Sequence, residues 1–148
     1  MCFLIFMYYI CVTLMCVRMK KYTILIAEDD ESNYLYLMLL LRKHYNLLRA
    51  MNGREAVEIA ERSKPDLILL DLKMPEMNGI EALRAIRQAG MAMPVIIQSS
   101  YAFEFDMRIA MENGASAYLT KPILRPNLFT ALDELGLLHD ELQPLKNK

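Results

Sequence analysis

Short apolar runs alternate with segments of helical spacing along most of this chain. The runs have the length, the β-branched residues and the two-sided apolar character of strands in a parallel sheet, and they lie at 22–27, 46–50, 66–71, 94–99 and 117–120. Helices are predicted between and after them, at about 32–44, 52–64, 80–90, 103–113 and 128–138. Five strands alternating with five helices predict an α/β domain with a five-stranded parallel sheet, doubly wound by helices on both faces.

Residues typical of helix ends support these boundaries. Asn52, with Glu55 three positions later, resembles a capping box at the start of the second helix, and Pro65 ends that helix. Gly114 is suited to a left-handed cap after the fourth helix. The segment from Lys73 to Gly79 is predicted to be a loop, because turn residues stand at both of its ends.

The first residues differ in character from the rest. Residues 2–17 form an uncharged apolar run followed by Arg18, Lys20 and Lys21, slightly shorter than the roughly 17–25 residues of a spanning helix. Either translation begins at Met19 and the run is a mis-called extension, or residues 2–17 anchor the chain to the inner membrane with the remainder in the cytoplasm. We divide the chain into an apolar leader (1–20), a domain (21–140) and a tail (141–148).

Composition excludes several classes of function. The formal net charge of −1 gives no basic surface for nucleic acid, so no nucleic-acid partner is expected. All three cysteines fall in the leader, so the domain has neither a disulfide framework nor a cysteine zinc site, which suits a reducing, cytoplasmic setting. His44 and His139 are isolated and far apart in the sequence, and we expect both on helix surfaces rather than in a metal site or a catalytic triad.

The candidate chemistry stands at the carboxyl ends of the predicted strands. The apolar run 67–70 leads directly into Asp71, and a charge at the end of so apolar a strand needs compensation. Ligands of open parallel sheets bind at these strand ends, where the other polar residues are Glu28, Asp29, Ser99 and Lys121. We therefore expect these side chains to converge on Asp71.

Three converging carboxylates favour a hard divalent cation such as Mg²⁺. Asp29 and Asp71 are the predicted direct ligands, with the backbone carbonyl of Lys73, while Glu28 acts through water. With charge neutralised by the cation and by the Lys121 ammonium, an Asp71 oxygen is an adequate nucleophile toward a phosphoryl group, and the Ser99 hydroxyl supplies a hydrogen bond. The predicted product is an aspartyl-phosphate.

These motifs resemble a known family over about residues 21–138. The sequences Ile24-Leu-Ile-Ala-Glu-Asp-Asp30, Leu70-Asp-Leu-Lys-Met-Pro-Glu-Met-Asn-Gly79, Pro94-Val-Ile-Ile-Gln-Ser-Ser100 and Gly114-Ala-Ser-Ala-Tyr-Leu-Thr-Lys-Pro122 are similar to those of the receiver domains of two-component response regulators, such as the chemotaxis response regulator. The resemblance implies a flavodoxin-like sheet with strand order 2-1-3-4-5. It also implies a phosphorelay in which a histidine kinase or histidine phosphotransfer protein donates to the domain.

The resemblance also implies roles for single residues. Asp71 is the phosphoacceptor, Glu28 and Asp29 are the acid pair, Lys121 is the invariant cation, Ser99 is the switch hydroxyl and Tyr118 is the rotating aromatic; Pro122 follows a cis peptide bond. Glu28 in place of the usual Asp and Ser99 in place of the usual Thr are mild departures.

The output is expected on one face of the domain. Phosphorylation would draw Ser99 inward and let Tyr118 turn in, moving the helix from Phe103, the strand 117–120 and the last helix. Phe103, Phe105 and Met107 are candidate contacts for an unknown downstream protein or a phosphorylation-dependent homodimer, with core packing as the open alternative. Membrane contact is expected only if the leader is real.

Other functions fit the sequence less well. We expect no enzyme activity beyond intrinsic phosphotransfer and autodephosphorylation. A metal-dependent phosphohydrolase would place a second Asp two residues after the nucleophile, where this chain has Lys73, and a non-phosphorylated interaction module would have lost an acid such as Asp71, or Lys121. We also hypothesise that Lys73 and Tyr101 obstruct the attack of water and make the phosphoryl group long-lived.

Overall fold

A single parallel sheet organises the part of the chain described by the computed structural model, residues 21–139 and 142. Its strand order is β2-β1-β3-β4-β5. The bounds are β1 Thr23–Ala27, β2 Asn46–Ala50, β3 Leu67–Asp71, β4 Val95–Ser99 and β5 Ala117–Thr120. The predicted strands and the strand order are confirmed. The leader alternatives concern residues 1–20, which lie outside the described residues.

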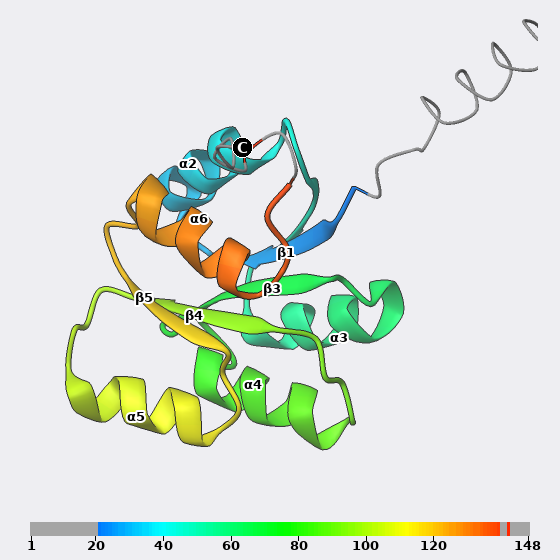
Figure 1. The fold of residues 1–148 in the computed structure, drawn as a ribbon. Helices are drawn as coiled ribbons and strands as arrows, with labels where there is room; N and C mark the ends of the chain where they lie inside the picture. Colours follow the sequence, from blue (N-terminus) through cyan, green and yellow to red (C-terminus); the bar gives the residue numbers. More distant parts are fainter. Residues whose placement is uncertain (1–20, 140–141, 143–148) are drawn as a thin grey trace, which may run out of the picture.

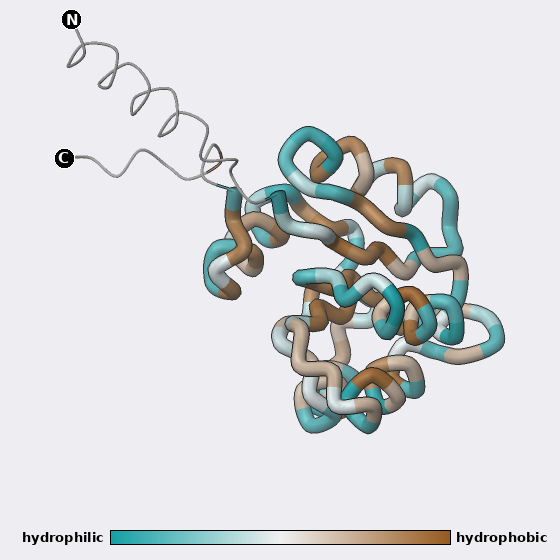
Figure 2. The backbone as a smooth tube through the Cα atoms, turned by 90° about the vertical axis from the view of Figure 1, so that its right-hand side faces the viewer, coloured by the Kyte–Doolittle hydropathy of each residue, from teal (hydrophilic) through white to brown (hydrophobic). Residues whose placement is uncertain are grey.

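Helices cover both faces of the sheet (Figure 1). Helices α2 (Glu31–Leu41) and α6 (Arg125–Glu134) lie on one face, and α3 (Gly53–Ser63), α4 (Gly79–Gln88) and α5 (Glu104–Glu112) lie on the other. Two hydrophobic cores result, one on each side of the strands. The hydrophobic colour in Figure 2 is accordingly concentrated along the strands. The doubly wound arrangement is therefore confirmed.

Two helices differ from their predicted bounds. Helix α2 ends at Leu41 rather than near His44, because the chain turns there and buries Tyr45. Helix α6 spans Arg125–Glu134 rather than about 128–138. Pro126 lies in its first turn, where the fixed φ of proline suits a helix start, and Gly136 adopts a positive φ of 69° just after its end.

One predicted helix cap also differs in detail. Asn52 Oδ1 accepts the N–H of Glu55 at 2.8 Å, but the Glu55 carboxylate accepts the N–H of Met51 instead of that of Asn52. A reciprocal capping box occurs at α4, between Asn78 and Glu81. It holds the start of α4 directly beside the loop that follows Asp71.

Neither histidine lies on a helix, because His44 is in the turn after α2 and His139 follows α6, so the prediction of helix-surface positions was wrong. Their ring centroids lie 5.1 Å apart, and His44 is buried. The neighbouring Tyr45 hydroxyl donates to Leu137 O at 3.0 Å and accepts the N–H of His139 at 3.1 Å. These contacts fasten the segment after α6 to the turn between α2 and β2.

Arg87 fastens α4 to the far end of α5. Its Nε and Nη2 donate to Gly114 O at 3.1 and 2.9 Å, and its Nη1 donates to the carbonyls of Met91 and Met93, each at 2.9 Å. One side chain therefore ties together the connections that precede β4 and β5.

Among residues 21–139 and 142, the helices are all too short or too polar to cross a membrane.

Candidate functional site

Three carboxylates meet at the carboxyl edge of the sheet. Glu28 and Asp29 directly follow β1, and Asp71 is the last residue of the neighbouring strand β3. Carboxylate oxygens of all three lie within 4.8 Å of one another. The parallel register of β1 and β3 produces this meeting, because both strands end at the same edge.

Lys121 provides the positive charge that the buried acids need. Its Nζ lies 2.6 Å from Glu28 Oε2 and 3.0 Å from Asp71 Oδ2. It follows β5, and its peptide bond to Pro122 is cis. Burial acts to lower the pKa of Lys121, but the hydrogen bond to Glu28 and the charge of Asp71 outweigh it, so the pKa lies above its ordinary value.

Glu28 is the most deeply buried acid of the site. Burial raises the pKa of its carboxyl group, against the lowering effect of its hydrogen bond with Lys121. Its Oε1 accepts the N–H of Asp30 at 3.1 Å, and the Gln98 side-chain amide lies 3.4 Å from its Oε2. Because Glu28 is longer than Asp, its carboxylate reaches Lys121 as well as the edge of the acid cluster.

Ser99 and Tyr118 both contact the loop between β4 and α5. Ser99 is buried, and its Oγ accepts the N–H of Tyr101 at 3.1 Å. The Tyr118 hydroxyl donates to Tyr101 O at 2.8 Å. Tyr101 therefore contacts both Ser99 and Tyr118, the two residues to which the family resemblance gives a switch role.

The loop after Asp71 lies close to the carboxylate. The N–H of Lys73 is 3.3 Å from Asp71 Oδ1, and the Lys73 ammonium contacts the Tyr101 hydroxyl. A groove of about 440 Å³ between these loops is lined by Leu72, Lys73, Asn78, Ile80, Tyr101, Phe103 and Asp106. Lys73 and Tyr101 therefore line one groove between the loops that follow β3 and β4.

The donor set suits a hard divalent cation. It consists of carboxylate oxygens, of which those of Glu28 and Asp71 are buried and that of Asp29 is exposed. Mg²⁺ prefers oxygen ligands and retains several waters, so one exposed side of the site matches its coordination. Asp30 has an ordinary structural role as the cap of α2. Asp71 instead contacts both the Lys121 ammonium and the N–H of Lys73.

Sequence reasoning missed two residues beside the site. Gln98 is buried in β4 and contacts Glu28, and Arg49 in β2 pairs with Glu31 at the start of α2. Both interrupt otherwise apolar strands, and a polar residue inside such a strand was the available signal. Their partners are set by the packing of α2 and β1, which sequence spacing does not show.

Comparison with known proteins identifies the family. Residues 24–133 match the model of the response regulator receiver domain. The chain is 39% identical over 100 residues to the alkaline phosphatase synthesis transcriptional regulatory protein PhoP of Bacillus subtilis, an alignment that covers 67% of this chain but only 42% of PhoP. It is 32% identical over 113 residues to the polar-differentiation response regulator DivK of Brucella anthropi, covering 74% of this chain and 92% of DivK.

A solved structure gives the same result. The fold is similar to that of a chain in the co-crystal structure of the Saccharomyces cerevisiae histidine phosphotransfer signaling protein Ypd1 and the receiver domain of its downstream response regulator Ssk1. The TM-score is 0.73 and the sequence identity is 33%, and the match covers 78% of this chain and 89% of the chain in that structure. The sheet order, the acid cluster with its lysine and these matches agree. The chain belongs to the family of response regulator receiver domains of two-component systems.

Proposed function

We propose that this receiver domain accepts a phosphoryl group on Asp71 and passes the signal on by protein contact. The observation that carries the proposal is the bridge from the Lys121 ammonium to Glu28 and Asp71, beside a cluster of three carboxylates. The Lys121 ammonium therefore lies next to the Asp71 carboxylate, where it can stabilise the charge of a transferred phosphoryl group.

In the proposed transfer, an Asp71 oxygen attacks the phosphorus of a phosphohistidine. The phosphorus–nitrogen bond breaks, and its electron pair stays on the imidazole nitrogen of the donor. Lys121 exchanges its contact with Asp71 Oδ2 for a phosphoryl oxygen, which its flexible stem allows. The hydrogen bond from the Tyr101 N–H to Ser99 Oγ breaks, and the Ser99 hydroxyl then donates a hydrogen bond to another phosphoryl oxygen.

Asp29, Asp71 and the backbone carbonyl of Lys73 would hold the Mg²⁺ ion directly, and Glu28 would act through water. The ion, when bound, neutralises charge that develops on the phosphoryl oxygens. The residues support this assignment because the Asp29 carboxylate is exposed beside the buried Asp71 carboxylate. Glu28 is already engaged by Lys121, which suits an indirect role.

The proposed donor is a histidine kinase or a histidine phosphotransfer protein. Support comes from the similarity to the receiver domain of Ssk1, which was crystallised with the histidine phosphotransfer protein Ypd1. Because Asp71 is consumed by the transfer and regenerated only by hydrolysis, the activity proposed is intrinsic phosphotransfer and autodephosphorylation, not enzymatic turnover of a substrate. A cytoplasmic location fits this class of donor.

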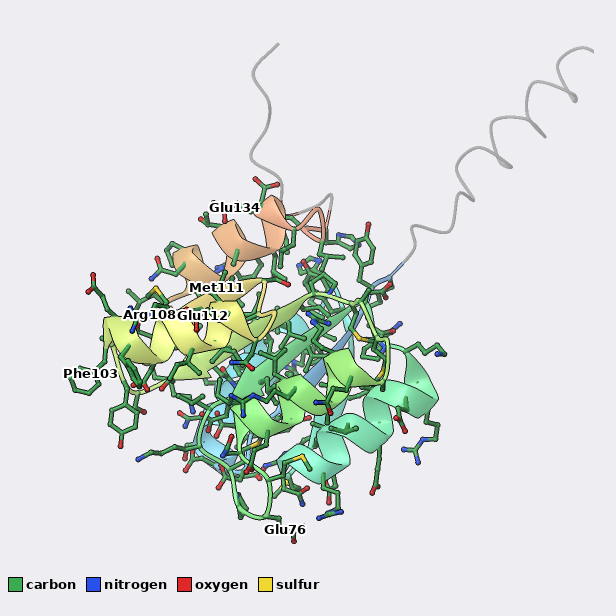
Figure 3. All side chains as sticks on the ribbon, turned by 90° about the horizontal axis from the view of Figure 1, so that it is seen from below. Glu76, Phe103, Arg108, Met111, Glu112 and Glu134 are labelled. Carbon is green, nitrogen blue, oxygen red and sulfur yellow. The ribbon has the colours of Figure 1, made fainter. Side chains whose placement is uncertain are left out.

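The proposed output face consists of α5, β5 and α6. In α5 only Ala110 is buried, whereas Phe103 and Phe105 are 65% and 61% exposed and Met107 is 41% exposed. Core packing therefore does not explain these three residues. Figure 3 shows Phe103 projecting from one end of α5, with Arg108 and Met111 farther along the helix. Such a face suits a downstream protein or a second, phosphorylated copy of this chain.

Phosphorylation with acetyl phosphate and Mg²⁺ tests the proposal. Intact-mass measurement should show one phosphoryl group on the wild type and none on Asp71→Asn. Asp66→Asn is the matched control. Asp66 immediately precedes β3, at the end of the strand away from Asp71, and accepts the N–H of Thr23. Absence of labelling in the wild type would contradict the proposed function and leave a non-phosphorylated interaction module.

A further inference from the structure

Arg49 joins strand β2 to the first turn of helix α2. It pairs in register with Ile26, two residues before Glu28. Its Nη1 lies 2.7 Å from Glu31 Oε2, and its guanidinium carbon lies 3.9 Å from the centre of the Tyr34 ring. Because Glu31 and Tyr34 are three residues apart on the helix, they lie on neighbouring positions of one face, and a single side chain holds both.

The contact is not one that chiefly stabilises the fold. Arg49 Nε and Nη2 are buried and have no hydrogen-bond partner within the described part of the chain. Buried donors without acceptors cost free energy, and the Glu31 side chain is 63% exposed, so its ion pair is screened by solvent. A methionine could cover the Tyr34 ring without these unpaired donors. These effects oppose the favourable contact with the Tyr34 ring, so we expect the net contribution of Arg49 to the stability of the fold to be small.

The turn that Arg49 holds ends the loop that carries the acid cluster. This loop begins at Glu28, whose N–H donates to Ala50 O at 3.1 Å. It ends at Asp30, whose Oδ1 caps α2 by accepting the N–H of Asn33 at 2.8 Å. Strand β2 therefore fixes the start of the loop through Ala50 and its end through Arg49. Asp29 lies between these two anchors.

Electrostatic repulsion acts against this loop position. Lys121 compensates Glu28 and Asp71, but within the described residues no basic side chain pairs with the exposed Asp29. The carboxylates of Glu28 and Asp71 repel that of Asp29 while no cation is bound. Without the contacts of Arg49 with Glu31 and Tyr34, the first turn of α2 would allow the loop to move outward, and Asp29 would separate from Asp71.

We propose that Arg49 is a positioning residue of the metal site: by holding Glu31 and Tyr34 it fixes the first turn of α2 and keeps the Asp29 carboxylate close enough to Asp71 for both to bind one Mg²⁺ ion. Arg49 itself touches neither the ion nor the phosphoryl group. This inference rests on the proposed Mg²⁺-dependent function and adds a residue from a different strand to it.

Calorimetric titration of the full chain with MgCl₂, without a phosphodonor, tests the proposal. Arg49→Met should weaken Mg²⁺ binding about tenfold, as loss of a residue that orients metal ligands typically does. Arg49→Lys, which keeps the charge and can still reach Glu31, should recover part of the affinity, and Glu31→Gln should weaken binding in the same direction. Arg62→Met is the matched control, since it removes the same charge from an exposed position in the last turn of α3.

Thermal unfolding in EDTA separates positioning from a structural role. The melting temperatures of Arg49→Met and Glu31→Gln should stay within about 4 °C of the wild type. An unchanged Mg²⁺ affinity in both variants would overturn the inference and leave the proposed function intact, and so would weakened binding that only accompanies a large fall in melting temperature. A wild type that binds no Mg²⁺ would overturn the proposed metal site itself.

Discussion

The Lys73 ammonium lies 4.2 Å from the centre of the Tyr101 ring and contacts the hydroxyl of the same residue. The two side chains come from different loops, one after β3 and one after β4. Tyr101 also stacks on Phe103, with ring centroids 6.1 Å apart and an interplanar angle of 20°. Lys73, Tyr101 and Phe103 all line the groove between these two loops.

Lys73 and Tyr101 should lengthen the life of the phosphoryl group. Lys73→Asn and Tyr101→Ala each open the line along which water attacks, so each should shorten the dephosphorylation half-life. The fold-shortening in the double variant should be smaller than the product of the two single effects, because the residues act as a pair. The half-life is measured in Mg²⁺ after removal of acetyl phosphate. Lys43→Asn, an exposed lysine beyond the end of α2, is the control. Half-lives of seconds that are unchanged in both variants would refute this prediction.

Gly79 should be intolerant of any side chain. A Cβ at this position would lie 2.3 Å from the carbonyl oxygen of Asp71 and 2.9 Å from Leu72 Cα. Gly79→Ala must therefore move the backbone at Asp71 and Leu72. We expect a loss of about 1–3 kcal/mol in unfolding free energy, together with slower phosphorylation. Gly90→Asn is the control, since Gly90 has a positive φ, which asparagine tolerates, and open space around its Cβ position. Equal stability of Gly79→Ala and wild type in urea unfolding would contradict the packing argument.

The Tyr45 contact should make stability fall in alkaline solution. Burial raises the pKa of the Tyr45 hydroxyl above its ordinary value of 10.0. The folded state therefore holds the proton more tightly than the unfolded state, so stability is unaffected well below pH 10 and is lost as the pH rises from about 10 toward the folded-state pKa. Tyr45→Phe should lose about 1–2 kcal/mol at neutral pH, because Leu137 O loses its donor. The difference between variant and wild type should narrow above pH 10, as followed by urea unfolding at each pH. A constant difference would show that Tyr45 does not titrate in this range.

The apolar face of α5 should serve association rather than folding. Phe105→Gln removes a side chain that is 61% exposed, so the melting temperature should change by less than about 4 °C. Association of the beryllofluoride-treated domain with itself or with a captured partner should weaken by tenfold or more, as loss of an aromatic interface residue commonly causes. Leu39→Gln is the matched control, because Leu39 on α2 has the same exposed fraction of 61%. Sedimentation with and without beryllofluoride measures the effect; equal weakening by both substitutions would argue against a specific role for α5.

The strands, and the convergence of the acidic residues at one edge of the sheet, could be predicted from the sequence. Apolar runs of five or six residues that end in polar groups mark buried parallel strands, and the topology then brings Glu28, Asp71 and Lys121 to one edge. Helix ends were harder to predict. Leucine spacing placed the last helix too late, although Pro126 and Gly136 carried the correct boundary signals.

Contacts between distant side chains could not be predicted. The His44–His139 and Arg49–Glu31 contacts depend on how α2 and the segment after α6 pack on the sheet. Neither pair has a local spacing rule, because the partners belong to different elements. The Lys73–Tyr101 contact is similar: sequence reasoning placed both residues near Asp71 but treated them as separate obstacles.

The Arg87 tether has a mechanical consequence for α5. The carboxyl end of this helix is held at Gly114 by Arg87 and at Asn113 by Arg84, whose Nε lies 2.6 Å from Asn113 Oδ1. The amino end begins at Phe103 without a side-chain cap and follows the loop that contacts Ser99 and Tyr118. A shift of that loop would rotate α5 about its carboxyl end at Gly114. The displacement would be largest at Phe103 and smallest near Met111. A partner that binds only the phosphorylated state would therefore be expected to contact the Phe103 end of α5.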